Sequence, residues 1–170
     1  MKKILMVLMG LEIGGAETHV VELSLTLQKR GWEVLVASNG GVYEKTLEEH
    51  GIRHFSVPTH TRSPKMMRRA YVALEQIIRQ EKPDIVHAHA RIPAFLCGKL
   101  QKKLGFPFVT TAHGVFRINP MLRFLSNWGR QTLAVSEDIR EYLIDQYDLP
   151  AGQIHVISNG IDTAAFSPEH

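Results

Sequence analysis

The sequence predicts an α/β protein built on a doubly wound, mostly parallel, Rossmann-like sheet of seven strands with helices on both faces. Short apolar runs alternate with amphipathic segments along the chain, which is the pattern of repeated strand–helix–strand units. A glycine pair, Gly14 and Gly15, separates the first apolar run from the first amphipathic segment. A chain of 170 residues can bury one substantial core, so we expect one domain over residues 1–157.

The expected strands are the apolar runs. Residues 4–8 are apolar throughout, as in a parallel strand that helices cover on both faces. Six further strands are expected at residues 33–37, 53–57, 84–89, 106–111, 131–135 and 153–157.

The expected helices are segments in which apolar residues recur every three or four positions. The first follows the glycine pair and has one apolar stripe: Ala16, Val20, Leu23 and Leu27. Three more are expected at residues 42–50, 65–80 and 92–104. Ser136 is a typical N-cap, and Glu137 follows it in the first turn of a last helix, where the helix dipole favours a carboxylate.

The glycine pair is the first candidate binding element. Without a Cβ at Gly14 or Gly15, the backbone can turn sharply and a ligand can approach the first N–H groups of the helix, which favour anions. A tight turn without a ligand is the alternative interpretation. The spacing matches neither the G-x-G-x-x-G fingerprint of dinucleotide-binding proteins nor the G-x-x-x-x-G-K-[ST] loop of nucleoside triphosphatases, and it argues against both classes.

The composition limits which cell compartment and which binding partners are expected. The formal charge is +3 with nine neutral histidines, too small a value to indicate nucleic-acid binding without a concentrated patch. No apolar stretch approaches the length of a membrane span, and the single cysteine, Cys97, lies on an apolar helical face. These features predict a cytoplasmic protein.

One basic cluster surrounds Met66 and Met67 in the helix expected at residues 65–80. Its members are Arg62, Lys65, Arg68 and Arg69. Such a cluster is either a solvated helix face or a surface for anionic lipid head groups, which would place the protein peripherally at the inner face of the membrane.

Polar residues lie at the carboxyl ends of several expected strands, and these ends form the ligand-binding edge of an open parallel sheet. Besides the glycine loop, these residues are His87, His89, Thr111, His113, Ser136 and Glu137. His87 and His89 point to the same face of their strand, as two metal ligands would. The local spacing supplies no third ligand, so we expect no metal and interpret His87 as a hydrogen-bonded histidine under a helix.

His113 is the candidate catalytic residue. It stands between Ala112 and Gly114, one residue past an apolar strand, so its imidazole is open to the ligand-binding edge. A histidine can donate a hydrogen bond to a hydroxyl or accept one from it near neutral pH. No G-x-S-x-G nucleophile motif or paired-carboxylate spacing accompanies it, so nucleophilic hydrolysis has no support.

Several stretches taken together resemble the amino-terminal half of the glycosyltransferase family 4 enzymes, which have the GT-B architecture of two Rossmann-like domains facing a cleft. The matching stretches are residues 14–17, 84–89, 111–114, 134–137 and 156–162, with Phe166 and Pro168. Each motif is weak alone, but their order and spacing agree over the whole chain.

The resemblance implies transfer of a sugar from a nucleotide-diphosphate sugar to a glycan or a lipid-linked acceptor, as in polysaccharide or lipopolysaccharide synthesis, without a bound metal. It places Gly14 and Gly15 near the donor diphosphate and His113 near the donor sugar and the attacking hydroxyl. The other residues expected to bind donor or acceptor are Ala16, Glu17, His89, Arg91, Thr111, Gly114, Ser136 and Glu137.

The chain departs from the family in lacking the second, donor-binding domain with its E-x7-E pattern. Residues 158–170, with Asn159, Gly160 and Asp162, match the start of the interdomain linker. We therefore expect an excised domain that has no appreciable activity alone. Half of a nucleotide-sugar epimerase, which would use carboxylates in the cleft, and a free-standing ligand- or membrane-binding module are the alternatives.

Overall fold

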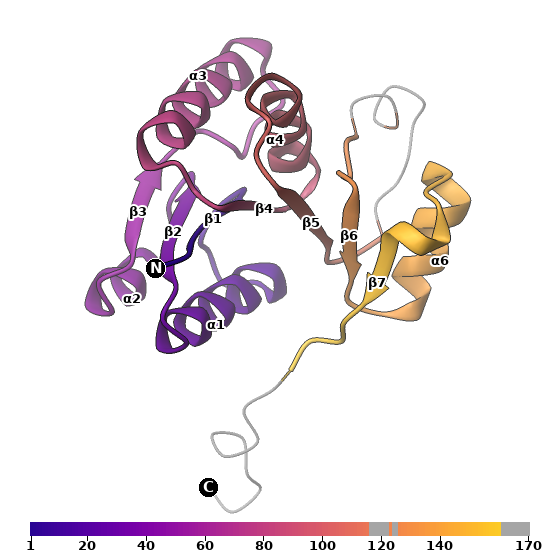
Figure 1. The fold of residues 1–170 in the computed structure, drawn as a ribbon, viewed down its shortest axis with the longest axis horizontal. Helices are drawn as coiled ribbons and strands as arrows, with labels where there is room; N and C mark the ends of the chain where they lie inside the picture. The colour runs from indigo at the N-terminus through magenta and orange to yellow at the C-terminus, as the bar shows by residue number, and fades with distance from the viewer. Residues whose placement is uncertain (116–122, 124–125, 161–170) are drawn as a thin grey trace, which may run out of the picture.

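The computed structural model describes residues 1–115, 123 and 126–160, and contains one sheet of seven parallel strands in the order β3-β2-β1-β4-β5-β6-β7 (Figure 1). The order reverses between β1 and β4, so the predicted doubly wound sheet is confirmed. The strands are β1 (Lys3–Leu8), β2 (Glu33–Ser38), β3 (Arg53–Ser56), β4 (Ile85–His89), β5 (Phe108–Ala112), β6 (Gln131–Ala134) and β7 (Ile154–Val156).

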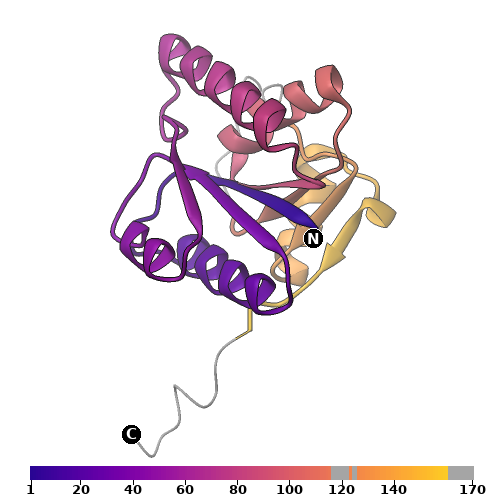
Figure 2. The same ribbon diagram turned by 60° about the vertical axis from the view of Figure 1, so that its left-hand side comes forward.

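Helices cover both faces of this sheet (Figure 2). The described helices are α1 (Gly15–Lys29), α2 (Glu44–Glu49), α3 (Pro64–Glu81), α4 (Arg91–Leu104) and α6 (Glu137–Tyr147), with a 3-10 turn η1 (Ala151–Gln153) before β7. Alternate residues of β1 divide between the two cores. Met6 packs with α1 and α2, whereas Leu5 packs with α3 and α4. A third cluster joins α6 to β5, β6 and β7.

The boundaries differ from the predicted ones by one or two residues, and β5 shows why. The strand begins at Phe108, not at residue 106 as predicted. Phe106 is instead buried in the core between α3 and α4, and Pro107 has no N–H to donate to the neighbouring strand. The Pro107 carbonyl still accepts a hydrogen bond from the Val86 N–H at 3.0 Å. The apolar run therefore begins before the first residue that pairs with a neighbouring strand.

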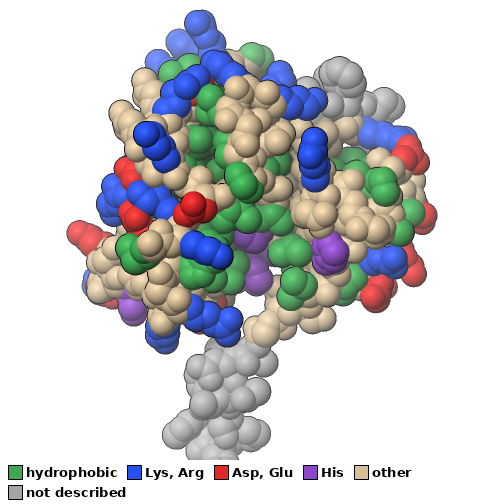
Figure 3. Space-filling model, viewed as in Figure 1, with side chains coloured by type: hydrophobic (Ala, Val, Ile, Leu, Met, Phe, Trp, Pro, Cys, Tyr) green, Lys and Arg blue, Asp and Glu red, His purple; other side chains and the backbone are tan. Residues whose placement is uncertain are grey.

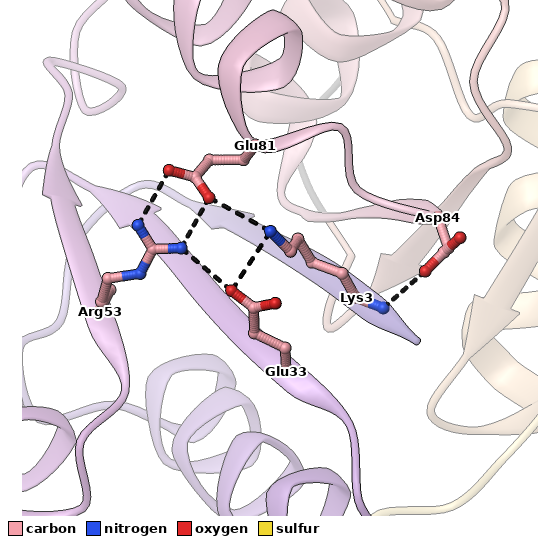
Figure 4. Close-up of polar contacts among 5 residues, drawn as sticks. All are labelled: Lys3, Glu33, Arg53, Glu81 and Asp84. Carbon is pink, nitrogen blue, oxygen red and sulfur yellow. Dashed lines mark hydrogen bonds and ion pairs between the residues drawn. The ribbon is translucent and has the colours of Figure 1, made fainter. Parts of the chain in front are cut away.

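Charged side chains join the amino ends of the first three strands (Figure 4). Arg53 Nη2 lies 2.6 Å from Glu81 Oε2 and 3.0 Å from Glu33 Oε1, and Lys3 Nζ bridges the same two carboxylates at 3.3 and 3.2 Å. The Lys3 backbone N–H also donates to Asp84 Oδ2 at 2.7 Å. This ion network ties α3 to the sheet at the edge opposite the one where ligands bind in such folds.

We expect Glu81→Gln to lower the free energy of unfolding at pH 7 by about 1 kcal/mol, the upper end for an exposed ion pair. The hydrogen bond from Arg53 lowers the pKa of Glu81, so its contribution is present above the usual carboxyl pKa of 4.5 and is lost as the pH falls through the folded-state value. Denaturant unfolding at pH 7 and pH 3 measures this. A deficit that is equally large at pH 3 would contradict the electrostatic account. Glu49→Gln, at an exposed pair with Lys45, is the control and should have no measurable effect.

Candidate functional site

Four adjacent strands bring the predicted site residues to one edge of the sheet. In the parallel register Leu8 at the end of β1 pairs with His89, and Ala112 at the end of β5 pairs with Ala134. The residues that follow these strand ends are therefore neighbours in space, although they are far apart in the sequence.

The glycine loop after β1 leads directly into α1. Gly14 is the N-cap, with extended backbone (φ −173°, ψ 161°), and its carbonyl accepts the Thr18 N–H at 2.9 Å. A Cβ on Gly15 would meet no atom within 4 Å, whereas a Cβ on Gly14 would lie 2.3 Å from Glu17 Oε2. The Glu17 carboxylate thus lies over Gly14 at the start of the helix, whereas the space beside Gly15 is empty. An anion that binds here has to displace the Glu17 side chain.

A second loop supports the first. The Leu11 N–H donates to the Gly40 carbonyl at 2.8 Å, and Gly41 (φ 149°) lies so close that a Cβ on it would be 2.4 Å from the Leu11 carbonyl carbon. Only glycine fits this approach. The β2–α2 loop therefore fixes the path of the chain before the glycine pair.

Three imidazoles converge beside this loop. His89 Nδ1 and His113 Nε2 are 3.1 Å apart, with ring centroids separated by 5.3 Å. His19, one turn into α1, has its ring centroid 5.1 Å from that of His113 and 5.9 Å from that of His89. We call these three residues the histidine cluster. Histidine side chains reach the surface near the middle of the face seen in Figure 3.

Burial keeps the histidine cluster uncharged. Desolvation, with a smaller effect of the charge on His19, lowers the pKa of His113 to about 4. Burial likewise holds the pKa of His89 well below its usual value and lowers the pKa of His19. At pH 7 each ring is a neutral group with one N–H donor and one lone pair. The cluster can therefore offer hydrogen bonds to a hydroxyl without bringing a positive charge.

His87 supports the cluster from beneath. Its Nε2 lies 2.7 Å from Thr111 Oγ1, and burial lowers its pKa to about 3. Its ring centroid lies 3.9 Å from that of His89, with the two ring planes tilted by 36°. The interpretation of His87 as a buried, hydrogen-bonded histidine is confirmed. Thr111 was expected to bind donor or acceptor, but it is 2% exposed and its hydroxyl contacts His87. Its position is that of a support for the cluster.

The remaining predicted residues lie around the histidine cluster or beyond it. Arg91 is the half-buried first residue of α4, next to Ala90, whose φ of 154° is rare outside glycine. Ser136 Oγ accepts the Ile139 N–H at 3.3 Å as the predicted N-cap, and the exposed Glu137 pairs with Arg140 at 3.5 Å.

Gly114 is open, since a Cβ there would meet nothing within 4 Å. Asn159 and Gly160 follow β7 and are exposed. Asp162, Phe166 and Pro168 lie outside the described residues.

A pocket of about 540 Å³ lies elsewhere, at the amino ends of β5 and β6, where Phe106, Phe108, Asn127 and Arg130 contribute to its lining. It contains none of the predicted site residues. The chemistry of this chain is concentrated at the histidine cluster, and we place the candidate site there.

Comparison with known proteins assigns the chain to a family. The model of Glycosyltransferase Family 4 matches residues 13–165, which include the glycine loop and the histidine cluster. The chain belongs to glycosyltransferase family 4. The predicted resemblance is thereby confirmed.

Relatives of this family 4 chain are longer than it is. One subunit of the phosphatidylinositol N-acetylglucosaminyltransferase from Arabidopsis thaliana is 26% identical, over 91% of this chain and 38% of its own length. A glycosyltransferase from Rickettsia africae superposes with a TM-score of 0.83 at 24% identity, over 99% of this chain and 46% of that one. The Anabaena protein HepE, crystallised with UDP, superposes with a TM-score of 0.79 at 20% identity, over 99% and 47%. The chain thus spans less than half the length of these relatives.

His19 was missed when the family 4 site was predicted from sequence. The signal was present, because His19 lies three residues after Ala16 and four before Leu23, on the stripe that faces the sheet. The stripe was treated as a purely apolar surface, and a polar residue on it near the helix start indicates the ligand-binding edge.

Proposed function

We propose that this chain is the acceptor-side domain of an enzyme that transfers a glycosyl group from a nucleotide-diphosphate sugar to a glycan or lipid-linked acceptor, in the synthesis of cell-surface polysaccharide or lipopolysaccharide. The observation that carries the proposal is the juxtaposition of the open Gly15 backbone with a cluster of neutral imidazoles at one sheet edge. Membership in glycosyltransferase family 4 and the UDP complex of HepE support it. The acceptor class is supported by the Arabidopsis relative, whose name specifies phosphatidylinositol.

Each part of the edge has a distinct role in this proposal. The N–H groups at the start of α1 receive the donor diphosphate after Glu17 turns away. Neutral His113 hydrogen-bonds the sugar or the attacking hydroxyl through Nδ1, which is buried in this structure and has to become accessible when substrate binds. His89 orients the His113 ring through the 3.1 Å contact with Nε2. Arg91, Gly114 and Glu137 flank the acceptor path. The transfer uses no metal in this scheme.

The donor half of the site belongs to a second domain in this proposal, and residues 158–170 begin the linker that leads to it. The test is transfer of labelled sugar from a panel of UDP-sugars to lipid-linked acceptors, with the 170-residue chain and with a longer protein that carries the second domain. We expect activity only from the longer protein. Equal activity of the 170-residue chain alone would show that the second domain is not needed for transfer. Absence of transfer by both proteins would overturn the proposed function.

Gly15→Val in the longer protein should weaken binding of the nucleotide-sugar at least about tenfold, which is about 1.4 kcal/mol. The valine side chain has free space in this structure, so folding should be nearly unchanged while the approach to the helix start is blocked. Calorimetric titration with the donor measures the change. Gly152→Val, at another open glycine far from the edge, is the control. Unchanged donor affinity would place the diphosphate elsewhere.

Docking of α3 on the inner face of the cytoplasmic membrane completes the proposal, with the protein otherwise in the cytoplasm. Arg62, Lys65, Arg68 and Arg69 are all exposed, while Met67 packs into the core and fixes the orientation of the helix. Lysine and arginine side chains gather over α3 and α4 along the top of Figure 3. Among the described helices, none combines the length and apolar character needed to cross a bilayer.

Replacing Lys65, Arg68 and Arg69 with glutamine should reduce binding to vesicles rich in phosphatidylserine by about 100-fold, since each basic residue near such a surface contributes about 1 kcal/mol. Co-sedimentation at low and high salt measures the binding. Neutralising three exposed cations outside α3 and α4, Lys29, Arg30 and Arg130, should have a smaller effect. Equal losses from both triple variants would mean that net charge, and not this helix, governs the binding.

The epimerase alternative has weaker support. A UDP-GlcNAc 2-epimerase from Methanocaldococcus jannaschii shares the fold, with a TM-score of 0.63 against 0.83 for the Rickettsia glycosyltransferase. An epimerase was expected to use carboxylates in the cleft. The group that converges at the described edge is made of three imidazoles, with the Glu17 carboxylate over the start of α1 beside it. The alternative of a membrane-binding module without catalysis predicts vesicle binding but no transfer by the longer protein.

A further inference from the structure

The histidine cluster has the geometry of a metal site as well as that of a hydrogen-bonding group. One ring nitrogen from each of His19, His89 and His113 lies within 4.8 Å of the other two. A tetrahedral Zn²⁺ with Zn–N bonds of about 2.0–2.1 Å places its nitrogen ligands roughly 3.4 Å apart. The 3.1 Å between His89 Nδ1 and His113 Nε2 is already close to that value. His19 is only half-buried, and its ring nitrogen has to approach the other two from within 4.8 Å.

The hydrogen bonding of the cluster is incomplete without a further partner. A neutral imidazole has one N–H and one lone pair. In the His89–His113 contact one ring donates and the other accepts, whichever tautomers are present. The two remaining nitrogens, His89 Nε2 and His113 Nδ1, are buried and have no hydrogen-bond partner among the described residues. No outer hydrogen bond therefore fixes the tautomer of either ring, so both protons can move to the outer nitrogens and leave the two facing lone pairs for a cation.

The three rings also come from well-fixed elements. His89 ends β4 and is 1% exposed, His113 follows β5, and His19 belongs to the first turns of α1. A metal binds deprotonated imidazole, which is the form that burial favours in all three rings. Little reorganisation or proton release is then needed when a cation enters.

We propose that His19, His89 and His113 form a binding site for a transition-metal dication of the Zn²⁺ type, with the fourth coordination position open on the solvent side. Three protein ligands and one open position are typical of zinc sites that accept an exogenous ligand. The metal and the sugar substrate would occupy the same edge, so zinc would act as a competitor of transfer. The competition with the sugar substrate rests on the proposed function, whereas metal binding itself does not.

Titration of the 170-residue chain with Zn²⁺ against a chromogenic chelator tests the site without any substrate. We expect one tightly bound ion per chain. His19→Ala should weaken binding by at least about 100-fold, because losing even an outer partner of a ligand costs 10–100-fold. His50→Ala, at an exposed histidine that follows α2 near the amino end of β3, should leave the affinity unchanged.

His19→Ala is the decisive variant, since His19 is half-exposed and its loss should not disturb folding, whereas His89→Ala removes a buried ring. Titration with Co²⁺ adds a spectroscopic readout, because four-coordinate Co²⁺ absorbs visible light far more strongly than the hydrated ion. Absence of stoichiometric zinc binding, or zinc binding that survives both His19→Ala and His113→Ala, would overturn the site. Neither result bears on whether the longer protein transfers sugar, so the two proposals fail separately.

Discussion

Replacing His113 with alanine is expected to lower the turnover of the longer transferase by about 10²–10³-fold, the usual effect of losing one hydrogen bond aimed at developing charge. The reason is position: His113 follows β5 at the sheet edge that contains the glycine loop, and His89 holds its ring. Folding should change little, because His113 is only partly buried and its described hydrogen bond is to His89. Initial-rate kinetics and denaturant unfolding of the same variant separate the two effects.

The pH dependence of the rate adds an independent check on His113. Burial lowers its pKa to about 4, so the ring stays neutral from pH 5 to pH 8 and should contribute no ionisation to the rate profile in that range. An ionisation near pH 6.5 that disappears in His113→Ala would contradict the neutral role. His50→Ala, near the amino ends of the strands, should retain full turnover. A loss of stability as large as the loss of turnover would make His113 a structural residue.

Mild acid should destabilise this chain markedly. In the unfolded state a histidine with a pKa near 6.5 is protonated at pH 5, whereas burial keeps His87, with a pKa of about 3, neutral in the folded state. The unfolded state then binds more protons, so stability falls as the pH drops below 6.5. His87 alone accounts for about 2 kcal/mol between pH 7 and pH 5. His89 and His113 add to the loss in the same direction.

Denaturant unfolding at pH 7 and pH 5 measures this loss. The window isolates the histidines, because hydrogen bonds to basic side chains lower the pKa of Glu75 and of Glu81 below 4.5, so these carboxylates stay ionised down to lower pH. His113→Ala should show a smaller difference between the two pH values. Equal free energies of unfolding at pH 7 and pH 5 would show that the buried rings accept protons without unfolding.

Local signals were sufficient to predict most of the sheet. The uniformly apolar run at residues 4–8 became β1 because a strand covered on both faces needs no polar side. Ser136 was recognisable as an N-cap because its hydroxyl bonds within its own helix, three residues on. The start of β5 was misplaced because Phe106, although apolar, does not belong to the strand. It packs in the core between α3 and α4.

The candidate site was predictable only in part, because its contacts join distant segments. The sequence placed His89 at the end of one strand and His113 just past another, at the same edge of the sheet. Their separation depends on the pairing and register of β4 with β5. The position of His19 over these rings depends on how α1 packs on the sheet. Thr111 was assigned to ligand binding because it ends a strand, and the direction of its hydroxyl toward His87 was not visible in the spacing.

The strand order also determines when each strand can pair while the chain is being synthesised on the ribosome. β1 lies in the interior of the sheet, and it pairs with β2 on one side and with β4 on the other, where Lys3 bonds to Asp84 across 81 positions. At a translation rate of roughly 5–20 residues per second, the edge of β1 that pairs with β4 stays unpaired for about 4–16 seconds. An unpaired apolar edge is a target for wrong pairing and for chaperones. β1 leads into the glycine loop, so this half of the site is synthesised first. The site is completed only when His89 at the end of β4 and His113 after β5 have emerged.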